Sequence, residues 1–122
     1  MRNMSFALTT AQVRAGTKTV TRRMGWTFLK PGDLVRPVVK SQGLKRGEKV
    51  EVIRVPLRIL SVRREPLERL LLESRYGLME CVREGFRDDP VLCWPQDFVE
   101  FFCRTHASRP EDLVTRIEFE YT

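Results

Sequence analysis

The chain is organised around one stretch of eight residues, Gly16-Thr17-Lys18-Thr19-Val20-Thr21-Arg22-Arg23, which carries three hydroxyls and three cations. Its Val and Thr content and its alternation are typical of an extended strand, with the threonines on one face and Lys18, Val20 and Arg22 on the other. Neither face is apolar enough to be a core face. The stretch is therefore either a strand that is solvated on both sides or one that lines a polar cleft.

The neighbouring residues predict how this stretch is held. Thr9 or Thr10 caps a short helix before it, and Gly16 is suited to end that helix. After it, Lys30-Pro31-Gly32-Asp33 fits a type II turn, which leads into a strand from Leu34 to Val39. The stretch should thus lie between a helix C-terminus and a β-turn.

The next strand region runs from Glu48 to Arg64, and its apolar residues change face twice. Slips of one residue imply bulges or a bend, which we place near Pro56. Strongly bent and bulged strands are what closing a small barrel requires.

Three helical stretches and a final strand complete the chain. Pro66 opens the first helix, the second spans residues 78–86, and the third spans residues 95–105 with an aromatic stripe that we assign to the core. Residues 113–121 alternate as a closing strand. No repeat, linker or low-complexity segment divides the chain, so residues 1–122 are predicted to form a single α+β domain, a small bent β-barrel with surrounding helices.

Composition excludes several classes of protein. No apolar run approaches the roughly 20 residues of a membrane span, and the first residues lead into no signal-peptide apolar region, so we expect a soluble, cytoplasmic protein without a membrane partner. Cys81, Cys93 and Cys103 are odd in number and lack C-x-x-C spacing, which favours buried free thiols over a disulfide framework or a zinc site. No dinucleotide fingerprint or P-loop is present, and no cofactor is expected.

The net charge of +6 is divided unevenly along the chain. Residues 1–64 carry 15 of the 22 Lys and Arg residues and three acids, a net charge of +12, whereas residues 65–122 have a net charge of −6. This asymmetry predicts either a face that attracts the phosphates of RNA or a solvated basic surface. The basic loop over residues 40–47 is in turn either a site that cradles an anion or a mobile loop. The cations that carry the signal are Arg14, Lys18, Arg22, Arg23, Lys40, Lys45, Arg46 and Lys49.

Other residue pairs give weaker signals. Cys103 and His106 are two potential metal ligands on one helix, but no further pair completes a site, which favours a core thiol beside a surface imidazole. Trp26 and Trp94 are either stacking platforms for bases or half-buried core aromatics, and we favour the core.

An ordered set of short motifs resembles the ASCH domain family along nearly the whole chain. The set is Gly16-x-Lys18-Thr19-x-Thr21-x-Arg23, Leu29-Lys30-x-Gly32-Asp33, Gly43-Leu44-x-x-Gly47-Glu48, Glu84-Gly85-Phe86, Phe98-Val99 and Ile117-Glu118-Phe119. ASCH domains are similar in fold to the PUA domains of RNA-modifying enzymes, so the resemblance implies a small β-barrel with an RNA-facing cleft.

The resemblance also implies a chemistry. One bacterial branch of the family hydrolyses the acetyl amide of N4-acetylcytidine with a Lys, a Thr and a Glu, which correspond here to Lys18, Thr21 and either Glu84 or Glu80. The implied function is binding of RNA or a modified nucleoside in a basic cleft, with hydrolysis of an N4-acylcytidine amide. The alternative is a non-catalytic RNA-binding module, because a shared fold does not ensure a shared reaction.

Physical chemistry sets conditions on this triad. Lys18 and Thr21 are three apart, so they reach one substrate only if the strand bends or bulges between them. Lys18 acts as a base only if burial or nearby cations depress its pKa, and Thr21 is then the nucleophile. Glu84 would orient Lys18 or carry a proton. The structural alternative is a Lys18–Glu84 ion pair that closes the cleft.

Overall fold

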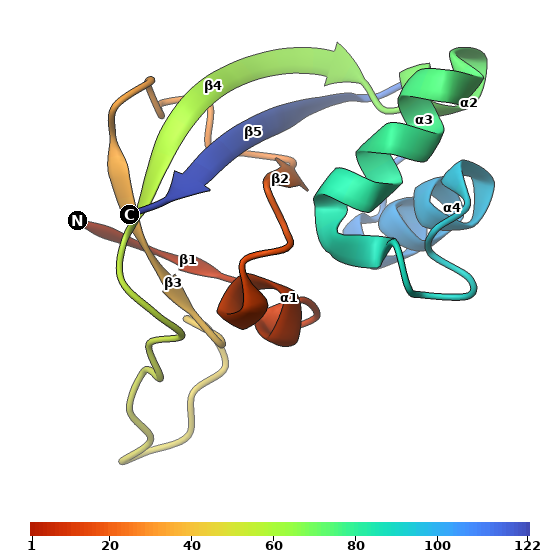
Figure 1. The fold of residues 1–122 in the computed structure, drawn as a ribbon. Helices are drawn as coiled ribbons and strands as arrows, with labels where there is room; N and C mark the ends of the chain where they lie inside the picture. Colours follow the sequence, from red (N-terminus) through yellow and green to blue (C-terminus); the bar gives the residue numbers. More distant parts are fainter.

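The computed structural model describes residues 1–122, and its five strands form one mixed sheet (Figure 1). The strand order is β1-β3-β4-β5-β2, with β1 parallel to β3 and every other neighbouring pair antiparallel. The strands are β1 (Arg2–Ser5), β2 (Val20–Arg23), β3 (Leu34–Val38), β4 (Leu57–Pro66) and β5 (Leu113–Tyr121). The long pair β4 and β5 arches over the rest and reaches the helices at the far end (Figure 1).

The α+β class is confirmed, but the sheet does not close into the predicted barrel. The two edges are β1 and β2, each of four residues, and no ladder joins them. Their link is a side-chain bond, in which Arg23 Nη2 donates to the Ser5 carbonyl over 2.7 Å. The predicted bulge is present, but it lies between Ile59 and Ser61 within β4, after the position near Pro56 where we placed it.

The predicted strand from Glu48 is wrong over its first part. Residues 48–56 form a loop in which only Val52 makes an isolated bridge, to Val38. The strand begins at Leu57 because Pro56 has no N–H to donate to a ladder. The strand predicted from Leu34 to Val39 is present and ends one residue earlier, at Val38. The type II turn before it is confirmed, since Gly32 has φ 94° and the Asp33 N–H donates to the Lys30 carbonyl over 3.0 Å.

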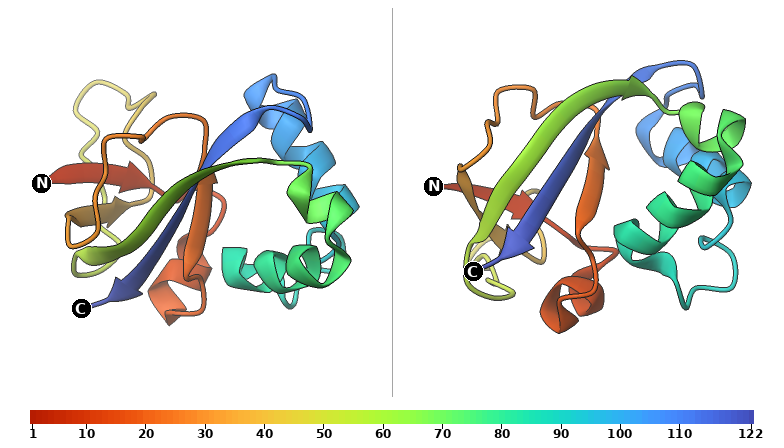
Figure 2. Two further views of the ribbon diagram at one scale, coloured as in Figure 1. Left: turned by 90° about the horizontal axis from the view of Figure 1, so that it is seen from above. Right: turned by 45° about the horizontal axis from the view of Figure 1, so that its top comes forward.

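Helices cover one side and one end of the sheet (Figure 2). They are α1 (Thr10–Ala15), α2 (Arg69–Leu72), α3 (Ser74–Cys81), the π-helical turn η1 (Val82–Phe86) and α4 (Pro95–His106). Gly16 ends α1 with φ 81°, as predicted, although Thr9 at the N-cap makes no side-chain cap bond. Pro66 ends β4 and does not open a helix. No helix has the length and apolar character that crossing a bilayer requires.

Two hydrophobic clusters hold these layers together. One lies between the sheet and α1 and includes Met4, Val13 and Phe119. The other lies among α2, α3, η1 and α4 and includes Leu70 and Phe98. Both are apolar, and the residues between them are charged, which makes the junction of the two layers the polar centre of the molecule.

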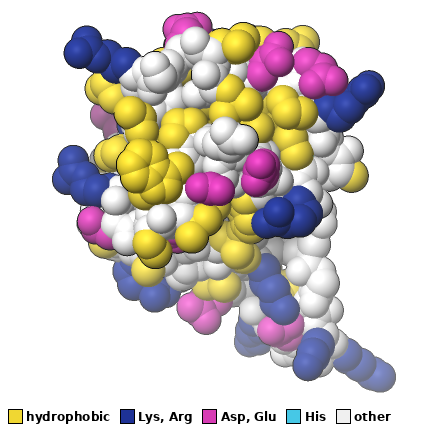
Figure 3. Space-filling view, turned by 90° about the vertical axis from the view of Figure 1, so that its right-hand side faces the viewer, with side chains coloured by type: hydrophobic (Ala, Val, Ile, Leu, Met, Phe, Trp, Pro, Cys, Tyr) yellow, Lys and Arg dark blue, Asp and Glu magenta, His cyan; other side chains and the backbone are white.

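Several residues expected in the core are not fully buried. Cys81 is a buried free thiol, whereas Cys93 and Cys103 are half-buried. Trp26 packs against the first cluster, but Trp94 has 55% of its surface exposed. Trp94 precedes α4 in a connection beside α3, and hydrophobic side chains gather over this helical side of the molecule (Figure 3).

The contact between α2 and α3 requires a glycine at position 77. A Cβ built on Gly77 would lie 2.0 Å from the Leu70 carbonyl oxygen and 3.0 Å from Pro95 Cγ. The first distance is far inside a van der Waals contact and involves backbone, so the two helices would have to separate.

We therefore expect Gly77→Ala to lower the free energy of unfolding by about 2 kcal/mol or more, despite the better helix propensity of Ala. Urea unfolding followed by circular dichroism measures this change. Gly25→Ala is the matched control, because a Cβ there meets nothing within 4 Å, and it should stay within about 0.5 kcal/mol of the wild type. Equal stability of both variants would contradict the close packing of α2 on α3.

Candidate functional site

The Lys-Thr stretch enters the site as a loop and only then becomes a strand. The predicted strand from Gly16 begins at Val20, because residues 16–19 make irregular contacts. The Thr19 N–H donates to the Arg83 carbonyl over 2.8 Å, and Tyr121 Oη donates to the Lys18 carbonyl over 2.5 Å. Lys18 therefore does not alternate with Thr21 along one strand, and both side chains line the same cavity of about 240 Å³.

Glu84 lies in this cavity beside Lys18. The Lys18 ammonium donates to Glu84 Oε1 over 3.0 Å and to the Glu84 carbonyl over 2.7 Å. That carbonyl belongs to the π-helical turn, where Gly85 has φ 100° and its missing Cβ would lie 3.3 Å from Lys18 Cβ. A turn of this kind releases a backbone carbonyl from the helical ladder, and π-turns are frequent at functional sites.

Burial gives Lys18 an altered acidity. Desolvation lowers the pKa of its ammonium, the Glu84 carboxylate opposes this shift, and the charges of Arg23 and Arg22 add to it. The result is a lysine that loses its proton more readily than a lysine in water, which is the property that a catalytic base needs.

The Thr21 hydroxyl is held by its neighbour Arg23. Arg23 Nε donates to Thr21 Oγ1 over 3.1 Å, so the hydroxyl oxygen accepts a charge-assisted hydrogen bond and its own proton is free to be donated. A cationic donor stabilises negative charge on the oxygen, which favours a nucleophilic alkoxide. The sequence predicted Arg23 as an RNA contact, which stays a prediction, and it did not predict the bond from Arg23 to Thr21.

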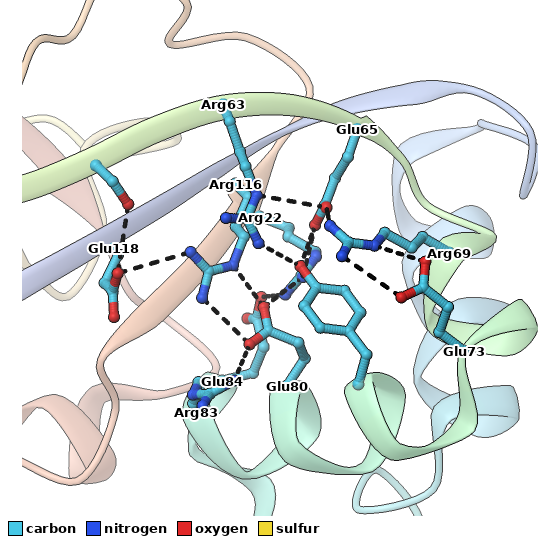
Figure 4. Close-up of polar contacts among 12 residues, drawn as sticks. Arg22, Arg63, Glu65, Arg69, Glu73, Glu80, Arg83, Glu84, Arg116 and Glu118 are labelled. Carbon is cyan, nitrogen blue, oxygen red and sulfur yellow. Dashed lines mark hydrogen bonds and ion pairs between the residues drawn. The ribbon is translucent and has the colours of Figure 1, made fainter.

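Arg22 is buried at the centre of a charge network (Figure 4). Its Nη2 donates to Glu65 Oε1 over 2.9 Å and to Glu80 Oε1 over 2.6 Å, and its Nη1 donates to Glu84 Oε2 over 3.0 Å. The prediction that Arg22 binds RNA is therefore corrected, because its side chain is 1% exposed and faces carboxylates. Its role is to hold the second oxygen of Glu84 while Lys18 holds the first.

Glu80 takes a different place from Glu84. It is fully buried and pairs with Arg22, Arg83 and Arg116, the last through two bonds of 2.6 and 3.2 Å. Burial opposes its ionisation, but the three guanidinium groups outweigh burial and lower the pKa of the carboxyl to about 2. Of the two carboxylates that the sequence left open, the structure places Glu84 next to Lys18 and Glu80 behind it, outside the cavity wall.

The rest of the cavity wall comes from the segment after β1 and from α4, and it is largely apolar. His106 lies at its rim and stacks on Phe102, with ring centroids 4.1 Å apart. His106 Nδ1 lies 3.0 Å from the Phe102 carbonyl, which only accepts, so we assign a proton to Nδ1. His106 lies 85 residues after Thr21 in the sequence. No sequence pattern indicated that the two side chains line the same cavity.

No family model matches the chain, and no curated protein matches it significantly. Among solved structures, an ASCH domain from Lactobacillus crispatus JV V101 aligns with 98% of this chain and 77% of its own length, at a TM-score of 0.55 and 15% identity. The chain has the fold of an ASCH domain. A DUF984 protein from Enterococcus faecalis V583 aligns with 91% of this chain and 67% of its own length, at a TM-score of 0.53 and 17% identity.

Within this ASCH fold, the other predicted RNA contacts do not line the cavity of Lys18 and Thr21; they are Arg14, Lys40, Lys45, Arg46 and Lys49. Arg14 pairs with Glu51 over 3.6 Å and Lys40 with Glu48 over 3.5 Å. The loop between β3 and β4 projects at the bottom of the molecule (Figure 1). Lys and Arg side chains gather on this loop in the space-filling view (Figure 3). The exposed predicted contacts on this loop that form no ion pair are Lys45, Arg46 and Lys49. The structure contains no cluster of three or more His, Cys, Asp and Glu side chains that could hold a metal ion.

The low pKa of Glu80 predicts an acid-sensitive fold. A carboxyl whose pKa falls from 4.5 to about 2 on folding contributes stability above pH 4.5, and this contribution is lost as the pH falls toward 2. We expect a loss on the order of 3 kcal/mol over that range from this group. Urea unfolding at a series of pH values measures it.

The matched variants are Glu80→Gln and Glu111→Gln. Glu80→Gln should be about 3 kcal/mol less stable at pH 7, because it leaves buried guanidinium groups underpaired, and its stability should fall less steeply below pH 4.5. Glu111→Gln changes an exposed carboxylate 3.7 Å from Arg109, and this variant should keep the stability and acid sensitivity of the wild type. A Glu80→Gln protein with wild-type stability and acid sensitivity would contradict this role.

Proposed function

We propose that this ASCH-fold protein binds a modified nucleoside, free or within RNA, in the cavity of Lys18, Thr21 and Glu84 and hydrolyses the N4-acyl amide of a cytidine. The observation that carries the proposal is the buried lysine whose pKa is lowered and whose ammonium is fixed by Glu84 in the same cavity as a threonine hydroxyl. A base, a nucleophile and an orienting carboxylate in one enclosed site are the parts that acyl transfer needs. The motif resemblance points to the same three residues.

The reaction divides into two acyl transfers. Neutral Lys18 takes the proton of the Thr21 hydroxyl, and the oxygen attacks the acyl carbon to give a tetrahedral intermediate. The bond between the acyl carbon and N4 then breaks, and Lys18 returns the proton to N4. Cytidine departs, and the acyl group stays on Thr21 as an ester. Water, deprotonated by Lys18, attacks the ester, and the bond between the acyl carbon and Thr21 Oγ1 breaks. Lys18 returns the proton to Thr21 Oγ1, which releases the carboxylic acid and leaves Lys18 neutral.

The surrounding residues support these steps. Arg23 Nε stabilises the Thr21 oxygen before it attacks and after it is released. Glu84, held by Arg22, fixes the Lys18 amine and stabilises the ammonium that forms in each half-reaction. The apolar wall contributed by Phe86, Phe98 and Phe102 excludes water from the base, which keeps the pKa of Lys18 low.

A second candidate function is a non-catalytic RNA-binding module. It is favoured by the Lys18–Glu84 ion pair at 3.0 Å, which in this function only closes the cavity, and by the cations on the projecting loop. In this case the loop cations would contact the phosphate backbone and the cavity would hold an unmodified base. Turnover separates the two functions.

The catalytic proposal predicts acetate release from N4-acetylcytidine. Lys18→Ala and Thr21→Ala should each abolish it, and the double variant should be about as inactive as either single one, because members of a catalytic unit are not additive. Glu84→Gln should lose most activity. Since Lys18 acts as a base, kcat/KM should rise with pH through a pKa below 10.5.

Circular dichroism must show that the variants stay folded, and Lys30→Ala, an exposed lysine outside the cavity, is the matched control. If the wild-type protein at high concentration releases no acid from N4-acetylcytidine or from other N4-acylated cytidines, the hydrolase proposal is wrong and the module remains.

RNA binding has its own signature in salt. If the projecting loop contacts a single-stranded backbone, log affinity should fall with log salt at roughly −0.7 per phosphate contacted. Lys45→Ala together with Arg46→Ala should flatten the slope by one or two contacts, measured by fluorescence anisotropy of a labelled oligonucleotide. Affinity that does not change with salt, or an unchanged slope in the double variant, would leave this loop as a solubilising surface.

A further inference from the structure

Arg23 differs from the other enclosed cations of the site. Lys18, Arg22 and Arg116 each form an ion pair with a carboxylate, but no carboxylate oxygen lies within 4.0 Å of Arg23. Its Nε and Nη2 donate to Thr21 Oγ1 and to the Ser5 carbonyl, whereas Nη1 forms no hydrogen bond, and the side chain is half-buried. A half-buried cation with neutral partners and a free donor can be stabilised by an anionic ligand.

Arg23 also lies where three cavities meet. It lines the cavity of Lys18 and Thr21, a second cavity of about 700 Å³ and a third of about 260 Å³. No Asp or Glu lines the second or the third cavity. Arg2 lines the second and Lys40 the third, where Lys40 also forms an exposed ion pair with Glu48 over 3.5 Å. The positive potential therefore continues outward from the catalytic cavity.

An aromatic surface lies beside this junction. Phe28 has half of its surface exposed in the second cavity, and its ring lies against Trp26, with centroids 5.4 Å apart. The Arg2 guanidinium covers Phe28 at 4.3 Å from the ring centroid. Trp26 has φ 66°, a left-handed conformation that a bulky residue adopts only where its surroundings impose it. Exposed rings next to cations are the arrangement that stacks bases beside a phosphate backbone.

We propose that Arg23, with Arg2 and Lys40, forms a phosphate subsite next to the nucleoside cavity, so that the ligand of this site is a nucleotide or an RNA segment and not a free nucleoside. This inference rests on the proposed nucleoside site and names its substrate class. Arg23 is then bifunctional: Nε faces the nucleophile and Nη1 faces the phosphate, so one guanidinium links substrate anchoring to the reacting oxygen.

Burial and the absence of a paired carboxylate are consistent with this assignment. Burial lowers the pKa of the Arg23 guanidinium to about 10, against a weaker opposing effect of Glu84, so the group is still charged at neutral pH. The phosphate thus replaces solvent around a charge that the fold leaves without a paired carboxylate.

Calorimetry with ligands that have no acyl group tests the subsite independently of turnover. The ligands are cytidine, 5′-CMP, 3′-CMP and a dinucleotide with a cytidine, at one ionic strength, and inorganic phosphate is the competitor. We expect at least one phosphate-bearing ligand to bind roughly tenfold to a hundredfold more tightly than cytidine, as a charge-assisted hydrogen bond implies. The two mononucleotides and the dinucleotide distinguish a terminal phosphate from an internucleotide one.

Three variants locate the effect. The phosphate preference is the ratio of the affinity for the phosphate-bearing ligand to the affinity for cytidine. Arg23→Gln should remove this preference. Because Arg23 also joins the sheet edges and could be needed for folding, the Arg2→Gln/Lys40→Gln double variant provides a second test and should reduce the preference severalfold. Arg109→Gln, an exposed arginine paired with Glu111, is the matched control and should keep the wild-type ratio.

The possible results separate this inference from the proposed reaction. Equal affinity for cytidine and every phosphorylated ligand, or no binding of any of them, overturns the subsite even if N4-acetylcytidine is hydrolysed. A phosphate preference that depends on Arg23 and on the Arg2/Lys40 pair supports the subsite even if no acid is released, and in that case only the hydrolase is wrong. A preference that survives both variants places the phosphate elsewhere and overturns the assignment.

Discussion

The pairing of Arg22 with Glu65, Glu80 and Glu84 is the interaction on which the rest of the structure depends. These residues lie between two apolar clusters, one under the sheet and one among the helices, so the charge network joins layers that hydrophobic contact alone would not bring into register. Burying ions costs several kcal/mol for each, which pairing with good geometry offsets. Both terminal nitrogens of Arg22 are paired with carboxylates, whereas its Nε is buried without a partner. The network therefore constrains β2, β4 and α3 to one relative position.

This constraint is transmitted to the cavity through Glu84. Arg22 holds one carboxylate oxygen and Lys18 the other, and the π-helical turn offers its carbonyl to the same ammonium. A hydrophobic junction of equal volume would often be as stable or more stable, so the polar centre does not optimise stability. What it provides is a lysine that is buried, fixed and still partly compensated, and this balance determines its acidity.

The open sheet serves the same site. A closed barrel would pair β1 with β2, but here the segment after β1, the edge strand β2 and helix α4 surround the cavity instead. Arg23 is the side chain that spans the two edges, through the Ser5 carbonyl. The short edge strands leave room for a ligand where a longer ladder would fill the space with backbone.

Features that depend on local backbone geometry could be predicted from the amino-acid sequence. The α+β class, the helix from Pro95, the glycine that ends α1, the turn at Gly32 and the bulge in β4 follow from periodicity, φ preferences and the donor that proline lacks. The motif resemblance also selected Lys18, Thr21 and Glu84 as a group. Tertiary structure alone decided that the sheet stays open, that Arg22 is buried, that Glu84 and not Glu80 contacts Lys18, and that His106 and Arg23 border the same cavity. The physical reason is that the partners of a charge are chosen by packing: Arg22 and Glu80 are 58 residues apart in sequence, and no local pattern records which of many carboxylates a buried guanidinium will meet.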